Sequence, residues 1–439
     1  MITNKDKNIA QWALEYAQKK GCQGVSVHLN KGTNTEVKLR NGKTDKLQQA
    51  SEAGLSIALY IDGKYGRIST NRLEKSALTS FIEQGISSIQ YLEKDLARTL
   101  PSKERYYQGG GEELEVFDTS FDQVTPDAKL SYAENIAYEV LGKDERILAV
   151  ESGFYDGQSF LYHLTSNGFE GERANTWFSV SSSISIKGDG DARPSDGWYE
   201  SSIFLKDLKK QGVGSIALER VLRKLGQKKI KSGKYRMILD PLVASRLVSP
   251  LIAAMNGNAI QQQNSFLLNK LGEGIGSKLF TLSDQPHLKR SSGARYFDGE
   301  GVATEPRKLF NEGVLQHYFI DTYSANKLQV EPTISSPSIL ILEKGERDLA
   351  GILQETSHGV FVTAFNGGNS NSSTGDFSFG IEGFLVENGQ LTTPISEMNI
   401  TGNLIDLWKG LVEVGNDPRL TSSWRIPTLV FDGVDFSGL

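Results

Sequence analysis

The first hundred residues alternate between helical and strand-like hydrophobic patterns. Apolar side chains recur at helical spacing from Ile9 to Ala17, which indicates an amphipathic helix. Residues 25–29, 35–39 and 55–60 alternate apolar and polar side chains, and we expect strands there. Further apolar positions predict a second helix: Leu73, Leu78, Phe81, Ile82, Ile89 and Leu92. Residues 1–100 are therefore predicted to form an N-terminal α/β module.

A polar, glycine-rich segment precedes a second module of the same kind. Residues 101–115 contain three consecutive glycines beginning at Gly109, and we interpret them as a linker. Residues 116–230 predict a helix over 127–141, strands between 147 and 187, and a helix over 214–225. This is a middle α/β module. Its architecture resembles that of the first module, although the sequence shows no repeat of fixed period.

Residues 231–439 have the pattern of a β-rich C-terminal domain. A strand over 235–239 leads to Asp240-Pro241, an N-cap followed by proline at the first helical position, so we expect a helix from Asp240 to Asn258. Pro250 should kink it. From Gly293 onward strands and turns dominate, with helices near 346–356 and 405–412. The predicted fold class is α+β, with two helix-plus-antiparallel-sheet modules followed by a β-rich domain.

Composition and charge narrow the possible functions. Hydrophobic residues make up 38% and charged residues 23%, an ordinary globular balance. The net charge of −5 provides no basic surface for phosphate contacts, so we expect no nucleic-acid partner. No apolar run reaches the length of a membrane span, and the N-terminus lacks the apolar region of a signal peptide. We therefore expect a cytoplasmic protein without a membrane partner.

The sequence offers few groups for catalysis or metal binding. Cys22 is the single cysteine, which excludes an intrachain disulfide and a thiolate cluster. The chain has five histidines, and the two nearest in sequence, His287 and His317, are 30 residues apart. No predicted helix therefore carries the histidine pair of a zinc protease, and no G-x-S-x-G or P-loop motif occurs. We predict no catalytic residue and no metal ligand in this chain.

Two polar stretches are candidates for ligand binding. Asp298 and Glu300 would face the same side of a strand, where paired carboxylates can perform acid–base chemistry, although the two glycines of this stretch favour a tight turn. Gly375 and Asp376 lie in a stretch rich in glycine and asparagine, which is typical of close backbone approach by a peptide or of a plain loop. We take these four residues as peptide-binding candidates.

An ordered series of short motifs resembles a known family. The chain is similar to the PmbA/TldE branch of the TldD/PmbA family, also called modulators of DNA gyrase, over nearly its full length. The motifs that carry the resemblance are Gln263-Asn264-Ser265-Phe266-Leu267-Leu268, Phe297-Asp298-x-Glu300-Gly301-Val302, Tyr323-Ser324-Ala325, Thr374-Gly375-Asp376, Val386-Glu387-Asn388-Gly389, Pro394-Ile395-Ser396-Glu397, Gly402-Asn403-Leu404 and Val414-Gly415-Asn416-Asp417.

The resemblance implies where a metal would be bound in a catalytic relative. The TldD branch carries H-E-x-x-x-H on a helix of its C-terminal domain and a cysteine further on. Here the corresponding positions are Ala253, Ala254 and Asn258, and Ser422 to Trp424 occupy the region of the cysteine. No histidine or glutamate occurs anywhere from Lys231 to Gly272, so a shifted alignment leads to the same conclusion.

The family resemblance further implies a heterodimer. A metal-bearing, TldD-like paralogue would supply the zinc chemistry, and this chain would complete the cleft that binds unfolded or modified peptides. One segment, 331–342, lacks the family's usual T-G-N/H stretch. Two alternatives remain open: a peptide-binding or scaffolding homodimer without a protease role, and an enzyme of another class that uses Asp298 and Glu300.

Overall fold

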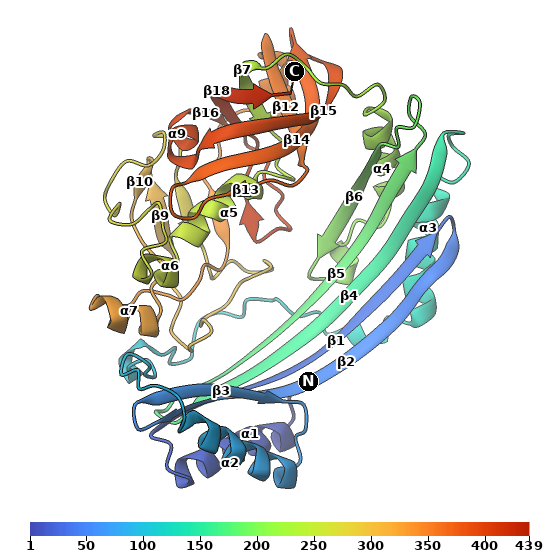
Figure 1. Ribbon diagram of the computed structural model, residues 1–439. Coiled ribbons are helices and arrows are strands. Elements are labelled where there is room, and N and C mark those ends of the chain that lie inside the picture. The colour runs from blue at the N-terminus through green and yellow to red at the C-terminus, as the bar shows by residue number, and fades with distance from the viewer. Residues whose placement is uncertain (439) are drawn as a thin grey trace.

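The N-terminal and middle modules share one antiparallel sheet. The computed structural model describes residues 1–438 (Figure 1). Six strands follow the order β3-β2-β1-β4-β5-β6. Their bounds are β1 (Gly24–Arg40), β2 (Lys43–Ile61), β3 (Lys64–Thr70), β4 (Ile147–Thr165), β5 (Glu170–Ile186) and β6 (Ser195–Ser202). Because β1 pairs with β4 of the next module along 15 residue pairs from Ser26 to Arg40, the two modules form one continuous surface.

Helices cover the two ends of this sheet. α1 (Asn4–Lys19) and α2 (Lys75–Ile89) pack at one end, and α3 (Pro126–Tyr138) and α4 (Val213–Leu222) at the other. Val25, Val27 and Leu29 of β1 are buried against the first pair of helices, whereas Val37 and Leu39 are buried against α3. This is the alternation expected of a strand with one covered face.

The strands are longer than the hydrophobic pattern predicts. Residues 25–29 and 35–39 belong to the single strand β1, because backbone pairing to β2 and β4 continues through Asn30 to Asn34 without interruption. The side chains there are mostly polar since no helix covers the middle of the sheet. The predicted class, α+β with two helix-plus-antiparallel-sheet modules and a β-rich C-terminal domain, is confirmed.

Two sheets build the C-terminal domain. The larger has the order β12-β7-β18-β15-β14-β13; β12 also pairs with β14, which closes a barrel-like ring, and β16 pairs with β18. The smaller has the order β10-β9-β8-β11-β17. The bounds are β7 (Gly233–Leu239), β8 (Leu282–Asp284), β9 (Arg307–Asn311), β10 (Val314–Leu315), β11 (Leu340–Leu342), β12 (His358–Phe365), β13 (Asn369–Ser370), β14 (Asp376–Glu387), β15 (Gln390–Asn403), β16 (Leu411–Val414), β17 (Trp424–Arg425) and β18 (Leu429–Ser437).

The expected helix from Asp240 to Asn258 was wrong at its start and in its continuity. Asp240 does not cap a helix: its carboxylate accepts the Leu242 N–H at 2.8 Å in a turn, and the helix begins at Ser245. The helix is then interrupted: α5 ends at Ala254, and a separate short helix begins at Gly257. The helices of this domain are α5 (Ser245–Ala254), α6 (Gly257–Gln261), α7 (Thr322–Leu328), α8 (Leu349–Gln354) and α9 (Leu404–Lys409). Pro250 lies inside α5.

The C-terminal domain lies on the concave side of the curved sheet (Figure 1). The segment 101–115, which includes the short helix η1 (Lys103–Arg105), packs against this domain: Leu114 is buried with Ala294 and Ile339. The middle module contains the short helices η2 (Phe121–Gln123) and η3 (Leu205–Asp207). Within residues 1–438, no helix is both long and apolar enough to cross a bilayer.

Candidate functional site

A cavity of about 490 Å³ opens beside α5 and α6 in the C-terminal domain. It contains Ala253 and Asn258, two of the positions where the sequence places the metal ligands of a catalytic relative, and it also contains Trp424. Its lining residues are Ser249, Ile252, Ala253, Asn256, Asn258, Ala259, Gln262, Asn264, Phe319, Ser335, Ser336, Pro337 and Trp424. Ala254, the third position, points into the core and is buried.

The interruption between α5 and α6 shapes one wall of the cavity. The Asn256 side chain caps α6 by accepting the Asn258 N–H at 3.0 Å. The Gly257 N–H donates to the Phe319 carbonyl at 2.7 Å, so the break is fixed to a neighbouring segment. A Cβ on Gly257 would lie 2.8 Å from the Ser324 Cβ, which explains why glycine is required at this contact.

Side-chain carboxamides supply most of the polar chemistry of the cavity. The Gln262 amide donates to the Asn258 carboxamide oxygen at 3.1 Å, and the Ser372 hydroxyl donates to the Asn264 oxygen at 2.9 Å. A carboxamide both donates and accepts hydrogen bonds, as a peptide group does. The lining contains no histidine, cysteine, aspartate or glutamate. This cavity can therefore bind peptide groups but offers no side chain that ionises near neutral pH.

The donor set does not fit the zinc that the fold family implies. Zinc in proteins is held by imidazole, thiolate or carboxylate groups, and an alanine methyl group at position 253 offers no lone pair. Nowhere among residues 1–438 do three or more histidine, cysteine or acidic residues gather closely enough to hold a metal. Cys22 is buried in the core beneath α1, and burial raises the pKa of its thiol to about 11.

Two histidines meet at the junction between the sheet and the C-terminal domain. His28 on β1 and His163 on β4 are cross-strand neighbours, and their rings stack with centroids 3.8 Å apart. The His28 Nε2 lies 3.1 Å from the Gly299 carbonyl oxygen. Burial lowers the pKa of His28 to about 4 and that of His163 well below its ordinary value. Both rings are therefore neutral packing groups, and neither lines the cavity.

Asp298 supports the cavity wall without lining it. Its side chain is fully buried, and its carboxylate accepts the backbone N–H groups of Glu300 at 2.9 Å, Val302 at 3.0 Å and Ser335 at 3.0 Å. Ser335 belongs to the lining. Since its oxygens face these backbone groups, Asp298 positions the loop that carries Ser335, and no face of the carboxylate remains for acid–base chemistry on a substrate.

Glu300 faces α7 rather than Asp298. Its carboxylate accepts hydrogen bonds from both the N–H and the hydroxyl of Thr322, the first residue of α7, each at 3.0 Å. Burial raises the pKa of Glu300 to about 7. The two carboxylates therefore hold different segments, and they do not form the paired site that alternation along a strand would produce.

Gly375 and Asp376 lie in the loop at the other edge of the cavity. The Asp376 carboxylate accepts from the Asn403 amide at 3.0 Å and from the Thr374 hydroxyl at 2.7 Å. Gly375 has a φ of +81° and packs on Phe266. The same loop reaches Asn264 of the lining through Ser372. None of the four predicted binding residues lines the cavity: Asp298 and the loop of Gly375 and Asp376 contact lining residues, whereas Glu300 contacts α7.

The sequence interpretation missed several lining residues. Gln262 and Asn264 end a polar run that begins at Gln261, and Ser335 and Ser336 precede Pro337. A polar run directly after a buried helix was the available signal, because such a run must reach the surface or a cavity. The Ser335-Ser336 pair carried no signal of its own, since its placement depends on the distant Asp298.

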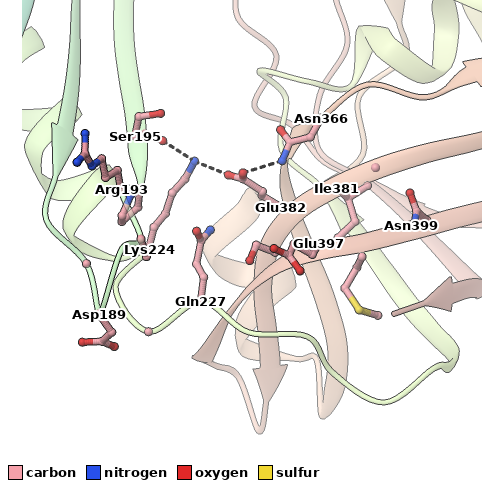
Figure 2. Close-up of a pocket in the computed structure, with 17 residues that line it drawn as sticks. Asp189, Arg193, Ser195, Lys224, Gln227, Asn366, Ile381, Glu382, Glu397 and Asn399 are labelled. Carbon is pink, nitrogen blue, oxygen red and sulfur yellow. Dashed lines mark hydrogen bonds and ion pairs between the residues drawn. The ribbon is translucent and has the colours of Figure 1, made fainter. Parts of the chain in front are cut away.

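A second cleft, of about 710 Å³, lies between the middle module and the C-terminal domain (Figure 2). Lys224, just beyond α4, crosses it and donates to Glu382 on β14 at 2.7 Å and to the Ser195 carbonyl at 3.0 Å. The Asn366 amide donates to the other Glu382 oxygen at 2.6 Å. These groups satisfy one another, so the bridge holds the two domains together.

Three domain profiles of one family match the chain in order. The PmbA/TldA metallopeptidase domain 1 matches residues 25–89, the central domain matches residues 119–225 and the C-terminal domain matches residues 232–438. The shared sheet, the barrel-like domain and the cavity beside α5 all lie within these matches. The protein therefore has the three-domain fold of this metallopeptidase family. It belongs to the PmbA/TldD family.

Individual relatives agree with this assignment. A curated relative is the metalloprotease PmbA of Escherichia coli O157:H7, which is 29% identical over 97% of this chain and 94% of its own. A solved structure described as a modulator of DNA gyrase from Bacteroides thetaiotaomicron is 59% identical, covers both chains completely and has a TM-score of 0.98. TldE from Thermococcus kodakarensis, at 19% identity and a TM-score of 0.86 over 98% of this chain and 99% of its own, shares the fold.

Proposed function

We propose that this chain is the non-catalytic partner subunit of a two-component zinc metalloprotease that acts on unfolded or modified peptides. The observation that carries the proposal is the cavity beside α5, in which every lining residue is apolar, a hydroxyl or a carboxamide. The family resemblance assigns the ligand positions of a catalytic relative to Ala253 and Asn258 in this lining. Zinc chemistry would come from a TldD-like paralogue, in keeping with the family and with curated relatives called metalloproteases.

The chemistry of the cavity suits a role in holding peptide. Carboxamides of Asn258, Gln262 and Asn264 can pair with backbone amides of any sequence, which an unfolded substrate requires. Trp424 and Phe319 add an apolar surface for side chains. A wall of this kind binds substrate without activating water, because it has no group that can remove a proton near neutral pH.

Reconstitution with the metal-bearing paralogue tests the proposal. We expect the paralogue and this chain to cleave an unfolded peptide together in a chelator-sensitive reaction, and this chain alone to show no cleavage. Replacing Asn258 and Gln262 with alanine in this chain should raise the KM of the pair about tenfold, with a small change in kcat, because a binding contact is lost. Robust chelator-sensitive cleavage by this chain alone would refute the proposal.

A matched control distinguishes the loss of contacts in the cavity from the loss of a carboxamide elsewhere on the protein. Gln11 is an exposed carboxamide on α1, and its replacement with alanine should leave both constants unchanged. The alternative, a peptide-binding homodimer without a protease role, predicts that peptide binds this chain equally well with and without the paralogue and that cleavage by the paralogue does not depend on it.

A further inference from the structure

A further hollow adjoins the cavity beside α5. Its volume is about 710 Å³, and it shares Ser249 and Trp424 with that cavity, so the two hollows form one groove along α5. We call it the arginine pocket. Beyond the two shared residues, its lining includes Val243, Ser245, Arg246, Phe365 and Ser422.

One face of α5 contributes to both hollows. Arg246, Ser249 and Ala253 are spaced three and four residues apart, so their side chains lie on the same face of the helix. Arg246 lines the arginine pocket, Ala253 lines the cavity, and Ser249 lines both. Leu247 and Leu251 are buried in the core on another face of the helix. A peptide that lies along α5 therefore passes from the cavity to Arg246.

Arg246 is the only ionisable side chain among the described residues that line the two hollows. Its guanidinium carbon lies 4.8 Å from the centre of the Phe379 ring, and its Nη2 donates to the Gly368 carbonyl at 3.1 Å. Within residues 1–438, no carboxylate forms an ion pair with it. Because a guanidinium carries several N–H donors, most of them remain for a ligand. The groove thus has one fixed positive charge without a negative partner.

We propose that the arginine pocket binds a carboxylate of the peptide substrate, either an acidic side chain or the C-terminal carboxyl group, and that Arg246 makes peptide selection depend on charge. This inference rests on the proposed function, because it describes the same substrate. A planar guanidinium can pair with a carboxylate through two parallel hydrogen bonds. The Ser422 hydroxyl accepts the Trp424 N–H at 3.0 Å, so its own hydrogen can donate to the same ligand.

The helix geometry indicates which position of the peptide carries the carboxylate. Ala253 follows Arg246 by seven residues, which corresponds to a rise of about 10 Å along α5. An extended peptide covers this length with about three residues. The carboxylate should therefore lie about three positions from the peptide residue that contacts Ala253. α5 begins at Ser245, so the partial positive charge of the helix N-terminus lies at the same pocket and adds to that of Arg246.

Peptide binding by the purified chain tests the charge preference without any cleavage. Isothermal titration calorimetry would compare short alanine- and serine-based peptides, blocked at both ends, that carry a single Glu or a single Gln at each position in turn. At the favoured position, we expect the Glu peptide to bind about five- to tenfold more tightly than the Gln peptide, and the difference to shrink as salt is raised. A neutral peptide with a free C-terminal carboxylate, compared with its amide, distinguishes the chain end from a side chain.

Substitutions at Arg246 assign the preference to this side chain. Arg246→Gln should bind the Glu and Gln peptides equally, Arg246→Lys should keep a weaker preference for Glu, and Arg246→Glu should favour a Lys peptide. Arg72 is the control, because it is exposed between β3 and α2 and lines neither hollow; Arg72→Gln should keep the full preference. In the pair with the paralogue, Arg246→Gln should raise the KM for the Glu peptide by the same factor, with little change in kcat.

Failure of this inference and failure of the proposed function give different results. Equal binding of the Glu and Gln peptides and of the free and amidated ends by the wild-type chain, a preference that survives Arg246→Gln, or no binding of any of these peptides would overturn the carboxylate site. Cleavage of neutral peptides by the pair would still support the proposed function in that case. Cleavage by the paralogue that does not depend on this chain would refute the proposed function, and the charge preference in binding would remain measurable.

Discussion

At the scale of single residues, carboxamides, hydroxyls and apolar groups make up the lining of the cavity beside α5. Asn258 and Gln262 hydrogen-bond to each other at the cavity wall, and Ala253 presents only a methyl group. Acidic residues near the wall are used to hold backbone: Asp298 fixes Ser335, and Glu300 fixes the start of α7. The acidic groups near the cavity therefore stabilise the fold, and the polar groups of the lining are carboxamides and hydroxyls.

Gly257 is predicted to be a residue on which the cavity depends. Substitution by alanine should lower the free energy of unfolding by about 2 kcal/mol, because the added Cβ would meet Ser324 and the Phe319 carbonyl. Denaturant unfolding measures the effect. Gly299→Ala is the control, since an added Cβ there meets nothing within 4 Å and its stability should stay near that of the wild type.

Glu300 should make the protein less stable as pH rises. The folded-state pKa of about 7 lies above the ordinary value of 4.5, so the folded protein binds more protons than the unfolded chain between these values. Stability contributed by the neutral carboxyl is present below pH 4.5 and is lost as pH rises through about 7.

The variant Glu300→Gln isolates this contribution. Glutamine keeps a neutral side chain at every pH, so the stability of the variant relative to the wild type should increase by up to about 3 kcal/mol between pH 5 and pH 8. Chemical unfolding across this range measures the difference. Parallel stability curves for the two proteins would show that Glu300 does not titrate as described.

At the scale of elements, the α5–α6 break decides which side chains face the cavity. The break places Ala253 and Asn258 on one wall, and it turns Ala254 into the core. The positions inferred for the metal ligands of a catalytic relative are therefore only partly accessible here, and the buried one has no room for a glutamate without repacking.

Introducing imidazoles tests this placement. The double variant Ala253→His with Asn258→His should bind zinc at least about tenfold more tightly than Ala253→His alone, because two nitrogen donors then share one cavity. Competition with a chromophoric chelator measures the affinity. Equal zinc affinity for the double and single variants would show that the two side chains do not meet.

The sequence predicted those elements whose pattern is local. α1 and α3 follow apolar residues at helical spacing, and the α+β class follows from helices alternating with paired strands. The middle of β1 was missed because its partners, β2 and β4, supply the backbone hydrogen bonds that its polar residues do not reveal. α5 was placed too early because Asp240-Pro241 makes a turn as readily as a helix start.

The candidate site was less predictable than the fold. Asp298 is remote in sequence from Ser335, yet its carboxylate fixes the loop that carries Ser335 in the lining. Such a contact depends on the tertiary arrangement, which no periodicity encodes. The family motifs located the neighbourhood of the cavity, since Asn264 and Thr374 to Asp376 all border it, but they could not distinguish lining residues from supporting ones.

At the scale of the whole molecule, charge-assisted contacts hold the C-terminal domain against the sheet. Lys224 donates a hydrogen bond to Glu382 across the junction (Figure 2). Lys224 also lies 3.1 Å from Asp196, and Arg419 donates to the Tyr199 carbonyl at 2.9 Å. Lys224 is buried, so these partners take the place of water around its ammonium group. The orientation of the domains should therefore be sensitive to its removal.

Replacing Lys224 with methionine should destabilise the protein by about 2 kcal/mol, because Glu382 and Asp196 lose a buried partner. Thermal and chemical unfolding measure the loss, and faster proteolysis between residues 222 and 232 would accompany it. Lys228→Met, at an exposed position in the same connection, is the control and should be neutral. Equal stability of both variants would argue against the bridge.

The central claim is that this chain brings no catalytic metal of its own, and metal content tests it most directly. Elemental analysis of the purified chain, dialysed against excess zinc and then against buffer, should give far less than one zinc per chain. The metal-bearing paralogue treated in the same way should retain about one. Stoichiometric zinc in this chain that is lost when the α5–α6 cavity is filled, for example by Ala253→Trp, would contradict the account.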